Sequence, residues 1–269
     1  MLVGMGNMGQ ALVKGWLQKG WQPSHITGVD PSGAADAFAK ETGISYLKSS
    51  EELFGEVDVV VFAVKPQVMA DVVPAYTSFK KYNCLFVSIA AGVDVPHLQG
   101  YLGGEASVVR VMPNMPASIG LGASGLYAAD SVSQEHKEQA ELLLDAVGEV
   151  VWVESEDKLD VVTALSGSGP AYFFLMIEAL AKAAMEQGLS EEDAVKLASA
   201  TAMGSGAVAV DKCMTNASIE AIESLREAVT SPAGTTYEGV KSLSEARFDE
   251  IVRQAIVAAR ERAYELRNS

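Results

Sequence analysis

The chain has 269 residues, of which 49% are hydrophobic and 20% charged, and its formal net charge at pH 7 is −15. This length and composition are typical of a soluble globular protein with one large domain or two unequal ones, and we expect two. The acidic excess, with no compensating block of Lys or Arg, opposes binding to nucleic acid or to an anionic membrane surface and favours a small-molecule substrate.

A glycine-rich turn opens the sequence. The first nine residues contain Gly4-Met5-Gly6-Asn7-Met8-Gly9, which follows a short apolar stretch and precedes a segment with the pattern of a helix. At a strand-to-helix turn this spacing is a dinucleotide-binding fingerprint. Gly4 allows the tight turn, Gly6 lets the backbone approach a pyrophosphate, and Gly9 lets helix and strand pack closely. A purely structural turn is the alternative.

Asp30 ends the next predicted strand, about twenty residues after the turn. An acidic residue there is placed to accept a hydrogen bond from a ribose 2′-hydroxyl and to repel the 2′-phosphate of NADPH. NADH is therefore expected to serve at least as well as NADPH. The hydroxyls of Ser32, Ser49 and Ser50 would donate to a phosphate if Asp30 turned away, so the choice between NADPH and NADH stays open.

Short apolar strands alternate with amphipathic helices over the first 154 residues, which is typical of a parallel sheet covered on both faces. The expected strands are residues 1–4, 25–30, 44–47, 57–64, 83–89, 107–112, 123–128 and 149–153. The continuous apolar run 57–64 predicts a central strand, buried on both faces. The expected fold class is α/β, with an N-terminal Rossmann-type doubly wound, mostly parallel sheet over residues 1–154.

Three of these strands end in residues suited to a ligand at the carboxyl edge of the sheet. Lys65 and Pro66 follow the central strand, and Lys65 is placed to hold a cofactor ribose or phosphate. Ala90 and Ala91 are small enough for a flat nicotinamide ring to lie against the backbone. Asn114, between two prolines, offers both a donor and an acceptor. A solvated lysine, a tight turn and a turn asparagine are the respective alternatives.

Residues 155–269 have helical periodicity throughout and are expected to form an all-helical substrate-binding and dimerisation domain. The expected helices are residues 172–185, 194–213, 218–228, 236–243 and 248–266, with Gly188 closing the first and Ser190 opening the second. The first helix is apolar almost all round, and about 115 residues leave too little interior to bury it. We expect a second subunit to cover it. The alternative is cover by the first domain.

The segment 230–237 reads Thr-Ser-Pro-Ala-Gly-Thr-Thr-Tyr. Gly234 allows a sharp turn, Thr235 or Thr236 is expected to cap a new helix, and the first N–H groups of that helix stay unpaired. Such a helix end binds a carboxylate, so these three residues are candidate substrate-binding residues. An ordinary threonine-capped helix is the alternative.

The two cysteines, Cys84 and Cys213, are far apart and outside any Cys/His cluster, so reduced thiols and no metal site are expected. The sequence shows neither a signal-peptide pattern nor a run of eighteen apolar residues. A cytoplasmic protein without membrane contact is the expectation.

Six motifs together resemble the pyrroline-5-carboxylate reductase family along essentially the whole chain. They are the glycine turn, Ala-Val-Lys-Pro-Gln from residue 63, Ala-Ala-Gly-Val from 90, Arg-Val-Met-Pro-Asn from 110, Ser-Gly-Ser-Gly-Pro-Ala-Tyr from 166, and Val-Thr-Ser-Pro-Ala-Gly-Thr-Thr from 229. The last is part of the segment 225–243, which resembles the family signature and is the most specific element. The resemblance implies reduction of 1-pyrroline-5-carboxylate to L-proline by NADPH or NADH, the last step of proline biosynthesis. It also implies a homodimer and often a ring of dimers.

The resemblance also assigns residues by position. On the cofactor it implies Gly6, Asn7 and Met8 at the pyrophosphate, Ser50 near the adenosine ribose, and Lys65, Pro66, Ala90 and Ala91 on the nicotinamide side. Gly234, Thr235 and Thr236 would receive the substrate carboxylate and ring nitrogen, in their own or a neighbouring subunit's pocket, with Thr236 as the catalytic residue.

The chain departs from the family at two places. The first strand is unusually short, so we expect either a clipped start or a first Met that lies inside the true strand. The acidic residue that the family has late in one helix is here at best Asp211, followed by an apparent insertion at residues 215–218, so Asp211 is given no role.

Two rival functions remain from the sequence. A β-hydroxyacid dehydrogenase or another imine reductase shares the plan, although residues 170–178 lack the lysine that the dehydrogenases use. A non-catalytic dinucleotide sensor would need only the fold. The threonine pair in the segment 230–237 argues against a sensor, which does not need a site for a substrate carboxylate.

Overall fold

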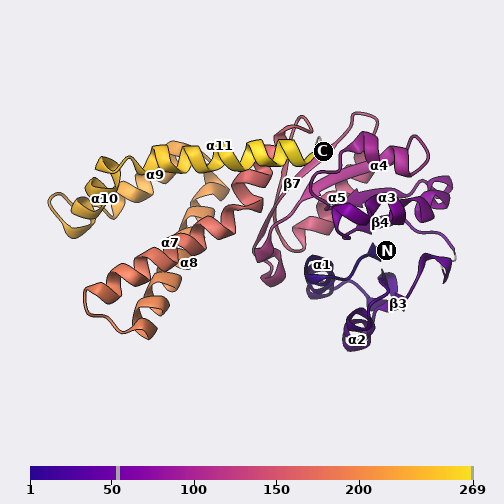
Figure 1. The fold of residues 1–269 in the computed structure, drawn as a ribbon, viewed down its shortest axis with the longest axis horizontal. Helices are drawn as coiled ribbons and strands as arrows, with labels where there is room; N and C mark the ends of the chain where they lie inside the picture. The colour runs from indigo at the N-terminus through magenta and orange to yellow at the C-terminus, as the bar shows by residue number, and fades with distance from the viewer. Residues whose placement is uncertain (53–54, 268–269) are drawn as a thin grey trace. The chain divides into compact units, whose positions relative to one another are not determined.

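The computed structural model describes residues 1–52 and 55–267 (Figure 1). Two compact units make up the chain: one contains Met1–Ser168 together with the residues after 256, and the other is Gly169–Ile256. The boundary between the two units, after Ser168, thus lies fourteen residues later than the expected domain boundary at 154/155. The chain returns to the first unit inside the last helix. The expected division of functions between residues 1–154 and 155–269 stays a prediction.

An eight-stranded sheet forms the first unit, with the order β3-β2-β1-β4-β5-β6-β7-β8. The strands are β1 (Leu2–Val3), β2 (Thr27–Val29), β3 (Ser45–Leu47), β4 (Val59–Phe62), β5 (Leu85–Ser88), β6 (Ser107–Met112), β7 (Gly122–Ala128) and β8 (Gly148–Trp152). All eight lie where the sequence predicts them. The first six are parallel in the Rossmann order, β7 runs antiparallel to β6, and β8 is parallel to β7. The doubly wound, mostly parallel sheet is confirmed.

Helices cover both faces of this sheet. In the central strand β4, Val61 points to one core, and Val60 and Phe62 point to the other, as the two-residue period of a strand requires. The first core is covered by α1 (Asn7–Gln18), α2 (Gly33–Thr42) and α5 (Gln134–Asp145). The second is covered by α3 (Met69–Val72), the 3-10 helix η4 (Val73–Tyr82) and α4 (Val95–Tyr101). Because both faces are buried, β4 and β5 read as continuous apolar runs.

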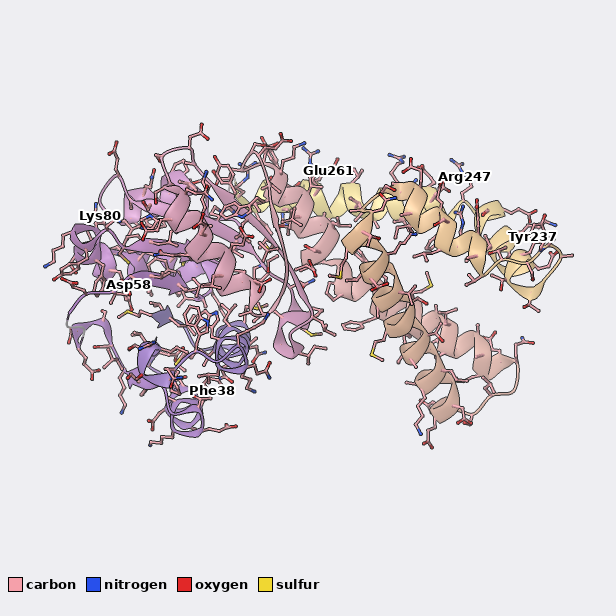
Figure 2. The ribbon with its side chains drawn as sticks, turned by 180° about the vertical axis from the view of Figure 1, so that it is seen from behind. Phe38, Asp58, Lys80, Tyr237, Arg247 and Glu261 are labelled. Carbon is pink, nitrogen blue, oxygen red and sulfur yellow. The ribbon has the colours of Figure 1, made fainter. Side chains whose placement is uncertain are left out.

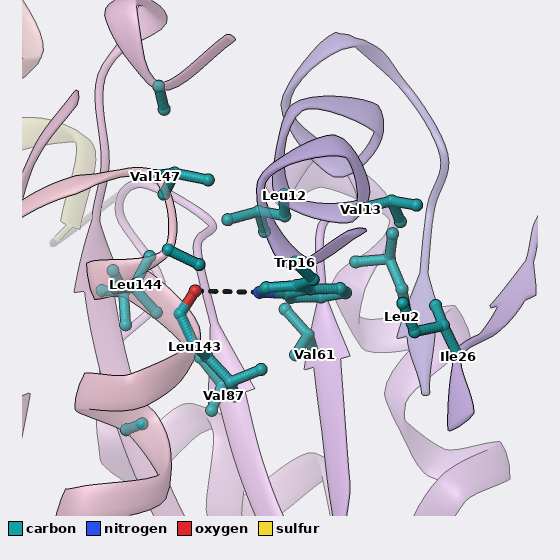
Figure 3. Packing of buried hydrophobic residues seen from close by; sticks show 14 of the residues in the cluster. Leu2, Leu12, Val13, Trp16, Ile26, Val61, Val87, Leu143, Leu144 and Val147 are labelled. Atoms are coloured by element: carbon teal, nitrogen blue, oxygen red, sulfur yellow. Dashed lines mark hydrogen bonds between the residues drawn. The ribbon is translucent and has the colours of Figure 1, made fainter. Parts of the chain in front are cut away.

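Trp16 of α1 lies in the middle of the first core, between Leu12, Val61 and Leu143 (Figure 3). Its indole Nε1 donates a hydrogen bond to the Leu143 carbonyl of α5, at 2.8 Å. This bond satisfies the one polar atom of the buried ring. It also ties α5 to α1, the helix that begins at the glycine turn, and so fixes the position of that turn.

The second unit consists of helices, and no strand follows β8 within the described residues. The helices are α7 (Gly169–Glu186), α8 (Glu191–Thr215), α9 (Ile219–Ala228), α10 (Thr235–Glu245) and the first part of α11 (Phe248–Arg267). Gly188 has a positive φ of 100° and the Ser190 hydroxyl accepts from the N–H of Asp193, as predicted for the end of one helix and the start of the next.

The helix α7 is apolar and largely uncovered. Phe173, Phe174 and Leu175 are 69%, 53% and 65% exposed, and the interior of the second unit is built around Ala181 and two alanines of α8. By length and composition, the helical stretch Lys158–Glu186 would be able to cross a membrane. An apolar surface of this size on a small helical unit is also typical of a subunit interface, which is what the sequence predicts.

Candidate functional site

The three glycines of the first turn have different surroundings. Gly4 has a φ of +93°, and a Cβ there would lie 2.8 Å from the carbonyl atoms of Ala63. A Cβ on Gly9 would lie 2.3 Å from the Gly4 oxygen, whereas a Cβ on Gly6 would meet nothing within 4 Å. Gly4 and Gly9 therefore serve the fold, and Gly6 leaves backbone open to a ligand. This division fits a dinucleotide pyrophosphate.

Helix starts differ in a way that points to ligands. Five helices, α2, α4, α5, α8 and α9, begin at a Ser or Asp whose side chain accepts from a backbone N–H of the first turn. Helices α1, α10 and the short helices α3 and α6 (Lys158–Val162) have no side-chain cap, and of these four α1 and α10 have a glycine, Gly6 and Gly234, as the N-cap. The first N–H groups of α1 and α10 remain available to an anion, one helix in each unit.

The expected cap of α10 was wrong. Neither Thr235 nor Thr236 caps the helix; they are its first two residues, and Gly234 is the N-cap. The reason is the preceding turn, in which the Gly234 N–H donates to the Ser231 carbonyl at 3.0 Å and brings the chain into the helix one residue earlier. A Cβ on Gly234 would lie 2.3 Å from the Ser231 hydroxyl, which would have to rotate away, and 3.1 Å from the Ser231 carbonyl oxygen, so the turn leaves little room for a side chain. Both threonines are exposed, beside Tyr237 of the same turn (Figure 2).

Asp30 is held firmly at the end of β2. Its Oδ2 accepts from the Met5 N–H at 2.7 Å, and its Oδ1 accepts from the Ser32 N–H at 2.8 Å. Burial alone would raise the pKa of Asp30, but these hydrogen bonds outweigh it and hold the pKa below its ordinary value of 3.8. The carboxylate is thus ionised and fixed rather than turned away, and it has acceptor capacity left for a ribose hydroxyl.

The predicted residues of the nicotinamide side follow β4 and β5. Because these strands are parallel to β1 and β2, all four carboxyl ends meet at one edge of the sheet. Lys65 is exposed and Pro66 opens the 3-10 helix η3 (Pro66–Val68), as predicted. Ala90 is buried, its N–H donates to the Ser88 hydroxyl at 3.3 Å, and Ala91 is exposed. The fold brings these residues to the same edge as the glycine turn and Asp30.

Asn114 has a structural role that the sequence did not reveal. It is 8% exposed, its Oδ1 accepts from the Ala123 N–H at 2.9 Å, and its Nδ2 donates to the Ser166 carbonyl at 3.0 Å. Ser166 lies in a π-helical turn, Thr163–Gly167, and is the first residue of the motif Ser-Gly-Ser-Gly-Pro-Ala-Tyr. Such turns misalign backbone carbonyls, and Asn114 satisfies one of them. Direct contact of Asn114 with the cofactor stays a prediction.

A buried ion pair supports the loop 90–92. Arg110 Nη1 donates to Glu156 Oε1 at 2.7 Å, with the two side chains only 5% and 17% exposed. The same Glu156 oxygen accepts from the Val95 N–H at 2.8 Å, at the start of the helix that follows the loop. Charge-assisted bonds of this kind hold a loop more firmly than neutral ones.

A second ion pair brings the end of α11 to the same loop. Arg267 Nη2 donates to Asp160 Oδ2 at 3.0 Å, with side chains 15% and 8% exposed. Gly92 has a φ of +76°, and a Cβ on it would lie 3.1 Å from the Leu266 carbonyl oxygen. Sequence patterns gave no signal for either ion pair, because the partners are separated by 46 and 107 residues.

The fold and the site residues of the first unit define a class, the nicotinamide-dinucleotide-dependent oxidoreductases. A family model described as NADP oxidoreductase, coenzyme F420-dependent, matches residues 1–92, and one described as pyrroline-5-carboxylate reductase dimerisation matches residues 156–266. The chain is 43% identical to the pyrroline-5-carboxylate reductase of Pseudomonas aeruginosa over 98% of this chain and 95% of that protein. It is 40% identical to that of Vibrio alginolyticus, over 98% and 96%. The chain belongs to the pyrroline-5-carboxylate reductase family.

Solved structures agree with this assignment. The pyrroline-5-carboxylate reductase of Coxiella burnetii superimposes with a TM-score of 0.92 at 37% identity, covering 98% of this chain and 97% of that one. The Plasmodium falciparum enzyme, solved with NADP bound, superimposes with a TM-score of 0.82 at 30% identity, covering 99% and 97%. A prephenate dehydrogenase of Aquifex aeolicus, at 15% identity and a TM-score of 0.51, shares the fold alone. The family membership sets aside both the dehydrogenase and the sensor alternatives.

Proposed function

We propose that this chain reduces 1-pyrroline-5-carboxylate to L-proline with a hydride from NADH or NADPH, the last step of proline biosynthesis. One observation carries the proposal beyond family membership. Among the helices of residues 1–52 and 55–267 for which an N-cap is defined, glycine is the N-cap of α1, at the glycine turn, and of α10, in the segment that resembles the family signature. Each offers backbone N–H groups to an anion, one suited to a pyrophosphate and one to a carboxylate.

In this proposal the first unit binds the dinucleotide. Gly6, Asn7 and Met8 present the first N–H groups of α1 to the pyrophosphate, and Asp30 accepts from the ribose. Bound NAD(P)H supplies the hydride for the C=N bond. We further propose that Ser50 contacts the adenosine ribose region of the cofactor. Its nicotinamide side contacts residues at the carboxyl edge of the sheet, namely Lys65, Pro66, Ala90, Ala91 and Asn114.

The second unit is proposed to bind the substrate. The N–H groups of Thr235, Thr236 and Tyr237 lie in the first turn of α10 and orient the substrate carboxylate, with Gly234 allowing its close approach. The Thr236 hydroxyl hydrogen-bonds the ring nitrogen, as the catalytic contact. Backbone dipoles suit this task in a protein with a net charge of −15, which has 20 Lys and Arg against 35 Asp and Glu. A protonated imine is already electrophilic, so positioning is the main contribution of these residues.

The test follows NAD(P)H absorbance after addition of 1-pyrroline-5-carboxylate. Thr236→Ala is expected to lower kcat/KM by about five- to a hundredfold, which corresponds to the loss of one oriented hydrogen bond, and Thr236→Ser is expected to restore most of it. Thr215→Ala is the matched control, because that hydroxyl bonds a carbonyl at the end of α8. Failure of the wild-type protein to oxidise either cofactor would overturn the function. Unchanged activity in Thr236→Ala would remove only the role of Thr236.

The proposed assembly is a homodimer through the helical unit, which matches the dimerisation model of the family, and a ring built from such dimers. The exposed phenylalanines of α7 support it, because water-exposed aromatic surface of this size is stabilised by a partner. We also propose a cytoplasmic protein that contacts neither membrane nor nucleic acid. The acidic charge supports this proposal, because it opposes both kinds of polyanionic surface.

A further inference from the structure

A second carboxylate, besides Asp30, lies at the adenosine end of the proposed cofactor site. The chain turns after β3, and there Glu52 Oε1 accepts hydrogen bonds from two successive backbone N–H groups, those of Lys48 at 3.1 Å and Ser49 at 3.2 Å. Successive backbone N–H groups in a turn can form a concavity that binds an anion such as a phosphate. In this chain its own glutamate occupies them.

This turn lies next to Asp30 in the sheet. Strands β2 and β3 are parallel neighbours, with Val29 opposite Leu47, and the Asp30 N–H donates to the Leu47 carbonyl at 3.1 Å. Lys48 therefore follows β3 at the level at which Asp30 follows β2. Nearby, the Tyr46 hydroxyl donates to the Asp30 carbonyl at 2.7 Å. Burial and then the charges of Asp36, Asp30 and Glu52 raise the pKa of Tyr46, so both carboxylates act on the same ring.

We propose that Glu52 is a specificity residue that, together with Asp30, closes the adenosine end of the site to a 2′-phosphate and makes the chain select NADH over NADPH. A 2′-phosphate brings two negative charges toward two fixed carboxylates, and the N–H groups that would compensate it are engaged. A free 2′-hydroxyl meets no such penalty, because it donates to a carboxylate. This inference rests on the cofactor site proposed above.

The positive charges and hydroxyls of this region do not offset the two carboxylates. Lys40 is paired with Asp36 at 2.8 Å. The Ser32 hydroxyl accepts from the Ala35 N–H and also bonds the Asp30 carboxylate. The Ser49 hydroxyl accepts from the Glu51 N–H and keeps its proton, which is one neutral donor against two negative charges. Lys48 is exposed at the end of β3 and is the cation to test. Water screens the exposed charges of Lys48 and Glu52 alike, but two backbone N–H groups hold the Glu52 carboxylate in place.

The experiment measures binding without substrate. Dissociation constants of NADH and NADPH, and of the fragments 5′-AMP and 2′,5′-ADP, are determined by calorimetry for the wild-type chain, Glu52→Gln and Glu52→Ala. Glu52→Gln keeps an oxygen for both N–H groups and removes only the charge, so the turn is preserved. Glu51→Gln is the matched control, since it makes the same change of net charge one residue away.

The wild-type chain is expected to bind NADH and 5′-AMP more tightly than their 2′-phosphorylated counterparts. Glu52→Gln should tighten NADPH and 2′,5′-ADP by on the order of fivefold, Glu52→Ala by more, and neither should change NADH more than about twofold. Lys48→Gln should leave all four constants within about twofold, since its charge is screened. The inference is overturned if the wild-type chain prefers NADPH, or if Glu51→Gln shifts the ratio as much as Glu52→Gln.

These outcomes are separate from those of the proposed function. A chain that reduces the imine but binds NADPH as tightly as NADH overturns the inference alone. A chain that shows the expected selectivity in binding but oxidises neither cofactor with 1-pyrroline-5-carboxylate supports the inference and overturns the proposed reaction.

Discussion

Alanine at Gly6 and alanine at Gly9 are expected to have opposite consequences, although the two positions are three residues apart. Gly9 lies inside α1, and a Cβ there would be 2.3 Å from the Gly4 carbonyl oxygen and 3.3 Å from Leu2 Cδ2. Gly6 is the N-cap, with φ −71° and ψ −171°, and a Cβ there would meet nothing within 4 Å. Alanine adopts such extended dihedral angles without strain.

The expected magnitudes follow from these distances. Contact with a backbone oxygen at 2.3 Å forces α1 and β1 apart by about 1 Å, so Gly9→Ala should lower the free energy of unfolding by about 3 kcal/mol, the upper end of the cost of overpacking. Gly6→Ala should change it by less than about 1 kcal/mol, because the weaker N-cap is offset by the smaller freedom of the unfolded chain. Its methyl group lies where we propose that the pyrophosphate approaches, so NAD(P)H affinity should fall by on the order of ten- to a hundredfold.

Urea unfolding followed by tryptophan fluorescence gives the stabilities, and titration with NADH and NADPH gives the affinities. Gly100→Ala serves as the control, because this glycine lies in α4, with nothing within 4 Å of a Cβ. Tight cofactor binding by Gly6→Ala would refute the assignment of the open backbone to the pyrophosphate. Wild-type stability of Gly9→Ala would refute the steric argument.

Three further outcomes are expected. Arg267→Met removes the partner of the nearly buried Asp160 carboxylate and should lower the free energy of unfolding, measured in urea, by about 3 kcal/mol. Adding Asp160→Asn to the same chain should recover part of the loss, and an unchanged urea midpoint of Arg267→Met would contradict this. The folded-state pKa of Asp30 is below its ordinary value of 3.8, so its ionised form adds stability that is complete above that value and is lost as the pH falls through the folded pKa. On acidification below about pH 4, the wild-type chain should therefore lose more stability than Asp30→Asn. Parallel curves of stability against pH for the two proteins would contradict this. Phe173→Glu, at an exposed position of α7, should shift the protein to a monomer in light scattering. A wild-type chain that is itself a compact monomer would contradict the proposed dimer.

The strands were predictable because short apolar runs bounded by turns carry their own signal, and each of the eight was found. The direction of β7 was not predictable beyond the expectation of a mostly parallel sheet, since side-chain pattern does not record the direction of a hydrogen-bonded neighbour. The late change between units has a similar cause. Helix α6 (Lys158–Val162) packs against β6 and β7, and such contacts join residues that are roughly thirty to fifty-five positions apart.

The candidate site was predictable where one residue type is required by backbone geometry, as at Gly4 and Gly9. It was less predictable where a side chain has two possible uses. Asn114 is as suited to a ligand as to the backbone groups that it binds, and the π-helical turn that it supports leaves no local pattern. The threonines of α10 are good caps by composition, but the turn before them places Gly234 in that position.

The discontinuous first unit has a consequence for how the protein is made. Residues 257–267 belong to the unit that contains the sheet, yet a ribosome adds them only after the whole of Gly169–Ile256. At roughly 5–20 residues per second, the nascent sheet waits several seconds for the helix end that pairs with Asp160. During translation the loop after β5 therefore remains without Arg267 and Leu266, and the unit reaches its final packing only when synthesis has passed both.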